Sequence, residues 1–185
     1  AWLTVEGLAT TSAPDSLPWK KVCLVNLEGF IDYPIDFVAN GLRELGAQVE
    51  MPTVSLDCLK QARRSATEMR ATNLAKVFAN TSNVARLADA INAVCSDAEA
   101  VLMPAVLGYE NDDVCSLLKA QVKTPLYFLA TLPPAVTGVR INAALKHYFQ
   151  MLGGRFLMGD SVENVAIDGD TVTHINTTKL QAMPL

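Results

Sequence analysis

Short apolar runs and helical apolar stripes alternate along the first part of the chain. The run KKVCLVNL at 20–27 predicts a buried strand, and apolar residues then recur at helical spacing over 35–45. Gly46 ends this predicted helix, and AQVEMPTV at 47–54 predicts a second strand. A strand, a helix and a strand in this order indicate a parallel βαβ unit.

The same alternation continues for some eighty residues. SATE at 65–68 fits a capping box, in which a serine and a glutamate satisfy the free N–H groups at a helix start. The predicted elements are a helix from this box to about 80, a helix at 84–95, a strand followed by a turn within 98–108, a helix ending at 120 and a strand at 124–132.

The pattern changes after Pro134. One more amphipathic helix ends at Gly153, and RFLM, SVENVAI and TVTHINTT then predict three short antiparallel strands, with DGD at 168–170 as a hairpin turn. We therefore divide the chain into an irregular linker at 1–19, a three-layer α/β domain of βαβ type at 20–135, and a helix with a β-meander at 136–185.

The composition narrows the class of protein. The chain has 185 residues with a formal net charge of −4, and 50% of its residues are hydrophobic, enough for a substantial core. Acidic and basic residues are interspersed, which argues against a nucleic-acid surface with its clustered basic face. No apolar run approaches the roughly 20 residues of a membrane span, so we expect a soluble chain.

The four cysteines are far apart and form no CxxC pair. Cys23 and Cys95 fall in apolar patterns and are predicted to be unpaired core residues, as free cysteines commonly are. A reduced cytoplasmic setting fits this interpretation. His147 and His174 lack neighbouring ligands at metal-binding spacing, so we predict no metal site and expect both imidazoles to be exposed.

The segment ATLPPAVTGVR at 130–140 is a candidate anion-binding corner. Arg140 and the free N–H groups at the start of the following helix favour a phosphate or carboxylate, and Thr131 and Thr137 could add hydroxyl donors. The alternative is an ordinary strand-to-helix loop, with an exposed arginine and two threonines in turn or cap positions. Both interpretations stay open.

Two further polar groups are candidates for substrate binding. Asn111 and Asp112 follow a predicted strand, and ligands of α/β sheets bind at the carboxyl ends of strands. Glu68, Arg70 and Asn73 are predicted to share one helix, where residues three apart can meet the same target. The alternatives are helix capping for the first group and a solvated helix face for the second.

Four stretches in a fixed order resemble one family: KKVCLVNLEGFIDY, SATEMRATNLAKVF, AVLMPAVLGYENDD and, above all, ATLPPAVTGVRINAALKHYFQMLGGRFLMGDSV. In these the chain is similar to the B subunit of bacterial anaerobic glycerol-3-phosphate dehydrogenase, a flavoprotein. The family usually carries another small residue and a proline in the region of 135–137. Thr137 departs from that pattern and is available as an N-cap instead.

The resemblance covers the middle of the family's sequence. None of the ten glycines makes the G-x-G-x-x-G fingerprint with which family members begin, so we expect an excised central region. Residues 20–135 would then be an inserted cap or substrate domain, and 136–185 would lead back into the flavin-binding domain. We expect the flavin, FAD or FMN, only in the intact subunit, and catalytic residues are not assigned.

The resemblance also implies an activity and partners. The family's complex oxidises sn-glycerol 3-phosphate to dihydroxyacetone phosphate and passes electrons toward membrane quinone, with fumarate or nitrate as terminal acceptor. Within this complex, the partners of the B subunit are the catalytic flavoprotein and the iron-sulfur membrane anchor. The complex lies at the cytoplasmic side of the inner membrane. The alternative is an assembly module that bridges electrons between these two partners without contacting substrate.

Overall fold

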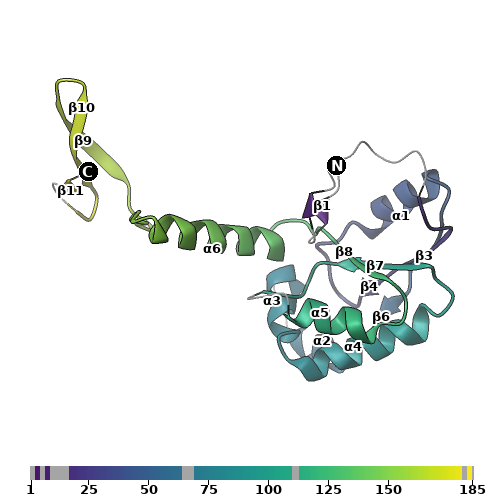
Figure 1. Ribbon diagram of the computed structural model, residues 1–185. Coiled ribbons are helices and arrows are strands. Elements are labelled where there is room, and N and C mark those ends of the chain that lie inside the picture. The colour runs from purple at the N-terminus through teal and green to yellow at the C-terminus, as the bar shows by residue number, and fades with distance from the viewer. Residues whose placement is uncertain are drawn as a thin grey trace. The chain divides into compact units, whose positions relative to one another are not determined.

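The chain divides into two units, residues Ala1–Asn142 and Ala143–Leu185. The computed structural model describes residues 3–4, 7–8, 17–63, 69–109, 113–180 and 183–184 (Figure 1). The border between the units falls inside helix α6 (Val136–Met151), and each unit is described by itself.

A six-stranded mixed sheet is the centre of the first unit. Its strand order is β2-β1-β8-β7-β3-β5, and the four strands β8, β7, β3 and β5 run parallel. Cys23 of β3 lies opposite Val101 of β7 in this register. The strands are β1 (Leu3–Thr4), β2 (Gly7–Leu8), β3 (Lys21–Leu24), β5 (Gln48–Glu50), β7 (Ala100–Pro104) and β8 (Leu126–Leu129).

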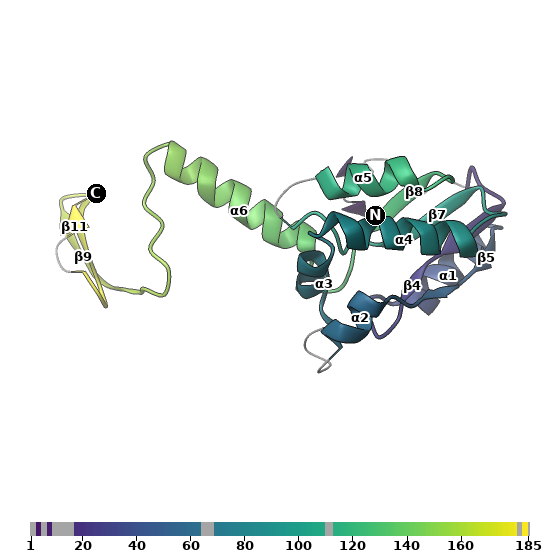
Figure 2. The ribbon, with the colours of Figure 1, turned by 90° about the horizontal axis from the view of Figure 1, so that it is seen from below.

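Helices cover both faces of this sheet. Figure 1 shows α1 (Ile35–Glu44) on one side, with α4 (Thr81–Val94) and α5 (Asp113–Gln121) on the other, and Figure 2 shows α4 and α5 side by side. Every residue of β7 is buried, as expected for a central strand covered on both faces. The predicted α/β class with a parallel sheet is confirmed.

The strand order creates a switch point between β3 and β7. The chain leaves β3 through α1 to reach β5 at the edge, then crosses back through α4 to reach β7 on the other side of β3. Because crossovers are right-handed, these two connections lie on opposite faces. Their loops diverge at the carboxyl ends of β3 and β7, where open α/β sheets bind ligands.

Some details of the predicted elements are wrong. Residues 1–19 were expected to be irregular, yet they contain β1, which pairs antiparallel with β8, and β2, which pairs antiparallel with β1. The strand predicted at 20–27 is divided, because β4 (Asn26–Leu27) leaves β3 and pairs with β6 (Thr53–Val54). A short helix, α2 (Asp57–Ala62), was not predicted at all.

The helix predicted to begin at 65 begins later. It is α3 (Ala71–Val77), and Arg70 before it has extended backbone, with φ −84° and ψ 152°. The capping-box residues Ser65 and Glu68 lie outside the described residues. The carboxylate of Asp32, in a distant loop, forms an ion pair with Arg70 and accepts the N–H of Ala71, the first residue of α3. A tertiary contact therefore sets this helix start.

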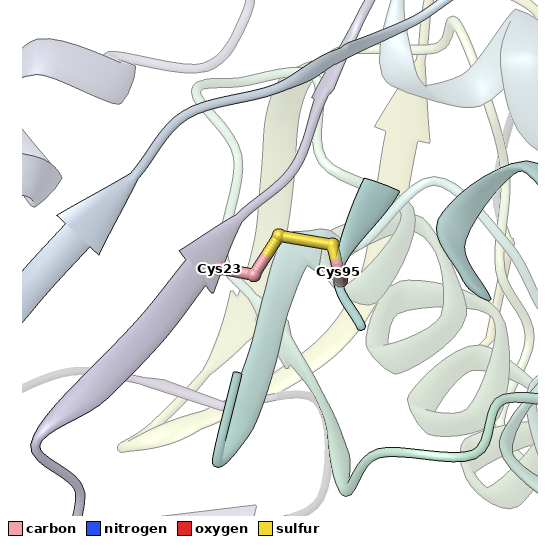
Figure 3. Close-up of a disulfide and its surroundings, with 2 residues drawn as sticks. All are labelled: Cys23 and Cys95. Carbon is pink, nitrogen blue, oxygen red and sulfur yellow. A yellow bond between two sulfur atoms is a disulfide. The ribbon is translucent and has the colours of Figure 1, made fainter. Parts of the chain in front are cut away.

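The cysteine prediction is right about burial and wrong about bonding. Cys23 on β3 and Cys95 after α4 are buried in the core, and they form a disulfide with a Cα–Cα distance of 5.8 Å (Figure 3). Unpaired thiols were expected because both residues fall in apolar patterns, and the two are 72 apart in sequence. They meet because α4 ends directly before β7, and β7 pairs with β3.

The second unit contains the rest of α6 and an antiparallel sheet. Strands β9 (Val162–Asp168) and β10 (Thr171–Thr177) form a hairpin in which Gly169 takes φ 59°, and β11 (Met183–Pro184) pairs with β10. The turn at 168–170 is confirmed. RFLM at 155–158 is not a strand, however, and β11 is the third strand of this sheet.

Candidate functional site

The loop after β4 holds a buried carboxylate at the carboxyl edge of the sheet. Asp32 is only 2% exposed, and its Oδ1 accepts a hydrogen bond from the Arg70 guanidinium in an ion pair. Its Oδ2 accepts the backbone N–H of Ala71 at 3.4 Å. Burying a carboxylate is costly unless it is paired, so Asp32 fixes both the guanidinium and the start of α3.

The same loop is tied to the segment that follows β8. The backbone N–H of Leu132 donates to the carbonyl oxygen of Asp32 at 2.8 Å. The peptide unit joining Thr131 to Leu132 therefore lies against the one joining Asp32 to Tyr33. Two candidates from the sequence, Arg70 and Thr131, come to the same region because both are connected to Asp32.

Two hydroxyl groups in this region are buried without a hydrogen-bond partner among the described residues. They are the phenol of Tyr33 and the Oγ1 of Thr131. The residues are 5% and 8% exposed, and burial raises the pKa of the Tyr33 phenol well above its usual value, so the phenol stays protonated. Unpartnered buried polar groups are uncommon in folded proteins and call for a specific explanation.

A second arginine meets this loop from the end of α2. Arg63 Nη1 lies 3.7 Å from Glu28 Oε1, and the Arg63 side chain packs over Gly29. Gly29 has φ +80°, and a Cβ there would lie 3.1 Å from Arg63 Nε, so a larger residue would strain the backbone and crowd the arginine. The loop at 28–34 thus carries two acidic residues, each paired with an arginine from a different element.

The other predicted site residues are distributed as follows. Thr137 and Arg140 lie in the first two turns of α6 and are half-buried. Thr137 is inside the helix, because α6 begins at Val136, so its predicted role as N-cap is wrong. Asn73 is half-buried in the first turn of α3, and Arg70 precedes that helix, so the two are not on one continuous helix face as expected. Glu68, Asn111 and Asp112 lie outside the described residues.

Asp32 and Tyr33 were not predicted from the sequence. The signal for Asp32 is a single carboxylate between the apolar residues Ile31 and Tyr33, in the loop that follows a buried strand run. Such a position indicates a charge that needs a partner from elsewhere in the fold. Which partner it takes is not encoded locally, since Arg70 is 38 residues away.

The described ranges contain neither a metal cluster nor a membrane helix. No group of three or more histidine, cysteine, aspartate or glutamate side chains there is arranged to hold a metal ion. His147 and His174 are exposed, as predicted. No helix in the described part of the chain is long and apolar enough to cross a membrane.

The chain matches the family model described as FAD binding domain over residues 2–185, and it belongs to that family. It is also similar to proteins named as the B subunit of anaerobic glycerol-3-phosphate dehydrogenase, which confirms the resemblance inferred from the sequence. The one from Yersinia enterocolitica is 34% identical over 184 residues, covering 100% of this chain and 43% of the relative. The one from Haemophilus influenzae strain Rd is 31% identical over 186 residues, covering 98% of this chain and 43% of the relative.

The chain therefore spans less than half the length of these relatives. No solved structure gives a significant match.

Proposed function

We propose that the chain is part of a flavin-dependent dehydrogenase that oxidises sn-glycerol 3-phosphate to dihydroxyacetone phosphate. The observation that carries this proposal is the match to the FAD binding domain family along nearly the whole chain, together with the names of the relatives. FAD is the flavin that the family supports, and FMN, the other flavin expected from the resemblance, has no such support. The flavin would accept the electrons, and residues of this chain would bind and orient substrate.

The electron path and the partners belong to the same proposal. Electrons would pass toward membrane quinone, with fumarate or nitrate as terminal acceptor, in a complex with a catalytic flavoprotein and an iron-sulfur membrane anchor. A complex of this kind would lie at the cytoplasmic side of the inner membrane. The names of the relatives, which specify one subunit of a dehydrogenase, support a complex of several subunits.

The two parts of the chain would have different roles. Residues 20–135 would form the cap or substrate domain, and 136–185 would belong to the flavin-binding domain. The exposed apolar residues of the second part support this division, because large apolar side chains in such number are normally covered. They include Leu145, Tyr148, Met151, Leu152, Val162 and Ile167.

The substrate phosphate would bind at the carboxyl edge of the sheet. Arg70 supports this role, because Asp32 holds one side of the guanidinium while 40% of the side chain is exposed. Arg140, Thr137 and Thr131 would contribute from the connector and the first turns of α6, where free N–H groups favour an anion. Asn73, Glu68, Asn111 and Asp112 complete the proposed substrate-binding set.

Replacing Arg140 in the intact dehydrogenase tests this site. We expect Arg140→Ala to raise the KM for sn-glycerol 3-phosphate about 10- to 100-fold, since a hydrogen bond to a charged group is worth roughly 1.5–3 kcal/mol. Steady-state kinetics give KM, and circular dichroism checks folding. Arg86→Ala, at an exposed position of α4, is the matched control and should leave KM unchanged. Wild-type KM in Arg140→Ala would remove this arginine from the substrate site.

Flavin content tests the division of the chain. The 185-residue chain lacks the G-x-G-x-x-G fingerprint, so it should purify colourless and bind FAD weakly, whereas the intact subunit should hold FAD. Absorbance near the flavin bands, with FAD titration by fluorescence quenching, measures this difference. Stoichiometric yellow flavin on the 185-residue chain would contradict the proposed division.

The alternative function is an assembly module that docks the catalytic flavoprotein and the membrane anchor and bridges electrons without contacting substrate. The exposed apolar residues of the second unit are the observation in its favour. NMR titration of the chain with sn-glycerol 3-phosphate separates the two proposals. Shifts at residues 131–140 favour a substrate site, and no shifts together with binding to the catalytic flavoprotein favour the assembly module.

A further inference from the structure

We propose that the Tyr33 and Thr131 hydroxyls line a polar subsite that receives the hydroxyl groups of a small polyol phosphate, whose phosphate meets Arg70. This inference rests on the proposed function and deepens it, because it assigns the carbon-chain end of the substrate to residues that were not expected to share a site.

The other buried polar side chains among the described residues have hydrogen-bond partners. Asp32 has Arg70 and Ala71, and the Thr177 hydroxyl donates to Asp160 Oδ2 at 2.7 Å and accepts from Leu180 N–H at 2.9 Å. Tyr33 and Thr131 are as deeply buried, yet neither hydroxyl has a partner among the described residues. Folding gains nothing from these oxygens and carries the cost of removing them from water.

The two residues also lie together at the edge of the sheet. The backbones of Tyr33 and Thr131 are adjacent, because Leu132 N–H donates to the Asp32 carbonyl. Exposed residues flank both positions, since Pro34 follows Tyr33, and Ala130 and Leu132 lie on either side of Thr131. The region is the carboxyl edge of β3 and β8, where ligands of parallel sheets bind.

The chemistry of the three groups selects the ligand class. A phenol and an alcohol each donate one hydrogen bond and accept others, which matches the hydroxyls of a polyol. The Arg70 guanidinium offers planar N–H donors to a phosphate, and Asp32 holds it in place. The positive charge of Arg70 is balanced by the negative charge of Asp32, so the side chains of this subsite, taken with Asp32, have no net charge. The anion therefore binds by geometry and hydrogen bonds more than by excess charge.

Stability measurements on the 185-residue chain test the first step. Tyr33→Phe and Thr131→Val each remove an unpartnered hydroxyl with little change of shape. The equilibrium constant for unfolding should therefore stay unchanged or fall by up to about fivefold, which corresponds to ~1 kcal/mol of added stability. Thr177→Val is the matched control, because this threonine is equally buried and its hydroxyl is bonded. Its local opening constant, from hydrogen exchange in β10, should rise about fivefold.

Binding measurements on the intact dehydrogenase test the second step. Tyr33→Phe and Thr131→Val should each raise KM for sn-glycerol 3-phosphate about tenfold with kcat little changed, and the double variant should show coupling if both line one subsite. Inorganic phosphate as a competitive inhibitor should bind Tyr33→Phe as it binds the wild type, because the arginines hold the phosphate and the Tyr33 phenol takes no part. Glycerol as a competitor should lose affinity in both variants.

The outcomes separate this inference from the proposed function. Clear destabilisation by Tyr33→Phe and Thr131→Val would overturn the inference, since it would mean that the hydroxyls are satisfied internally, for example by a water molecule. Stable variants with wild-type KM would also overturn it and leave the proposed function standing. If the wild-type intact protein neither oxidises nor binds sn-glycerol 3-phosphate, the proposed function fails, and the assigned ligand fails with it.

Discussion

Breaking the Cys23–Cys95 disulfide is expected to lower the free energy of unfolding of the first unit by about 4 kcal/mol. The bridge joins residues 72 apart, and a cross-link of that span removes much of the conformational entropy of the unfolded chain. Both sulfur atoms are buried in the core, so the oxidised chain should resist mild reductants until it opens. Urea unfolding of the oxidised chain, compared with Cys23→Ala/Cys95→Ala, measures the loss.

The chain supplies its own control for this experiment. Cys58 and Cys115 are also buried and are not disulfide-bonded, so Cys58→Ala/Cys115→Ala removes two buried sulfur atoms without removing a cross-link. The difference between the two double variants isolates the contribution of the bridge from that of packing. Equal losses in the two double variants would contradict a stabilising disulfide, as would a thiol assay that detects four free cysteines in unfolded, non-reduced protein.

Replacing Arg70 with methionine is expected to cost about 2 kcal/mol of stability. The substitution keeps the apolar stem and removes the guanidinium, which leaves the Asp32 carboxylate buried with the Ala71 N–H but without its cation. The cost is placed below the roughly 3–5 kcal/mol of a fully buried pair, because the Arg70 side chain is 40% exposed. Urea unfolding measures it.

Two further variants make this result specific. Asp32→Asn removes the charge and keeps the shape, so Arg70→Met in that background should cost about 1 kcal/mol less than in the wild type. Arg43→Met is the surface control, since Arg43 is exposed on α1 and bonds Asn40 Oδ1 and a backbone oxygen, and it should cost about 0.5 kcal/mol or less. If Arg70→Met lowers the free energy of unfolding no more than Arg43→Met does, the buried Asp32 carboxylate does not depend on Arg70 for its stability.

Most elements of the first unit were predictable from local pattern. Local periodicity is visible in the run at 20–27, the stripe at 35–45 and the apolar run at 98–108. It is visible because the burial of one helix face, or of a whole strand, requires apolar residues at regular positions close together in the sequence. The hairpin at 168–170 was predictable for a similar reason, since Gly169 supplies the positive φ that the turn requires. The element ends were less well predicted where a distant group fixed them, as Asp32 does at the start of α3.

The candidate site could be predicted only in part. Arg70 and Thr131 were chosen from the sequence, for reasons of helix spacing and loop chemistry, and neither reason placed them together. Asp32 and Tyr33 were missed because their importance depends on their surroundings in the fold. Asp32 meets the Arg70 guanidinium, and the Tyr33 hydroxyl has no hydrogen-bond partner among the described residues.

By itself the sequence determined the α/β class, the order of the elements and the resemblance to a flavoprotein, because periodicity and motif are properties of neighbouring residues. The tertiary structure decided which distant residues meet: Cys23 with Cys95, Asp32 with Arg70, and the Asp32 carbonyl with Leu132. These contacts depend on strand order and on where each loop leaves the sheet, and no local stretch of the chain specifies either.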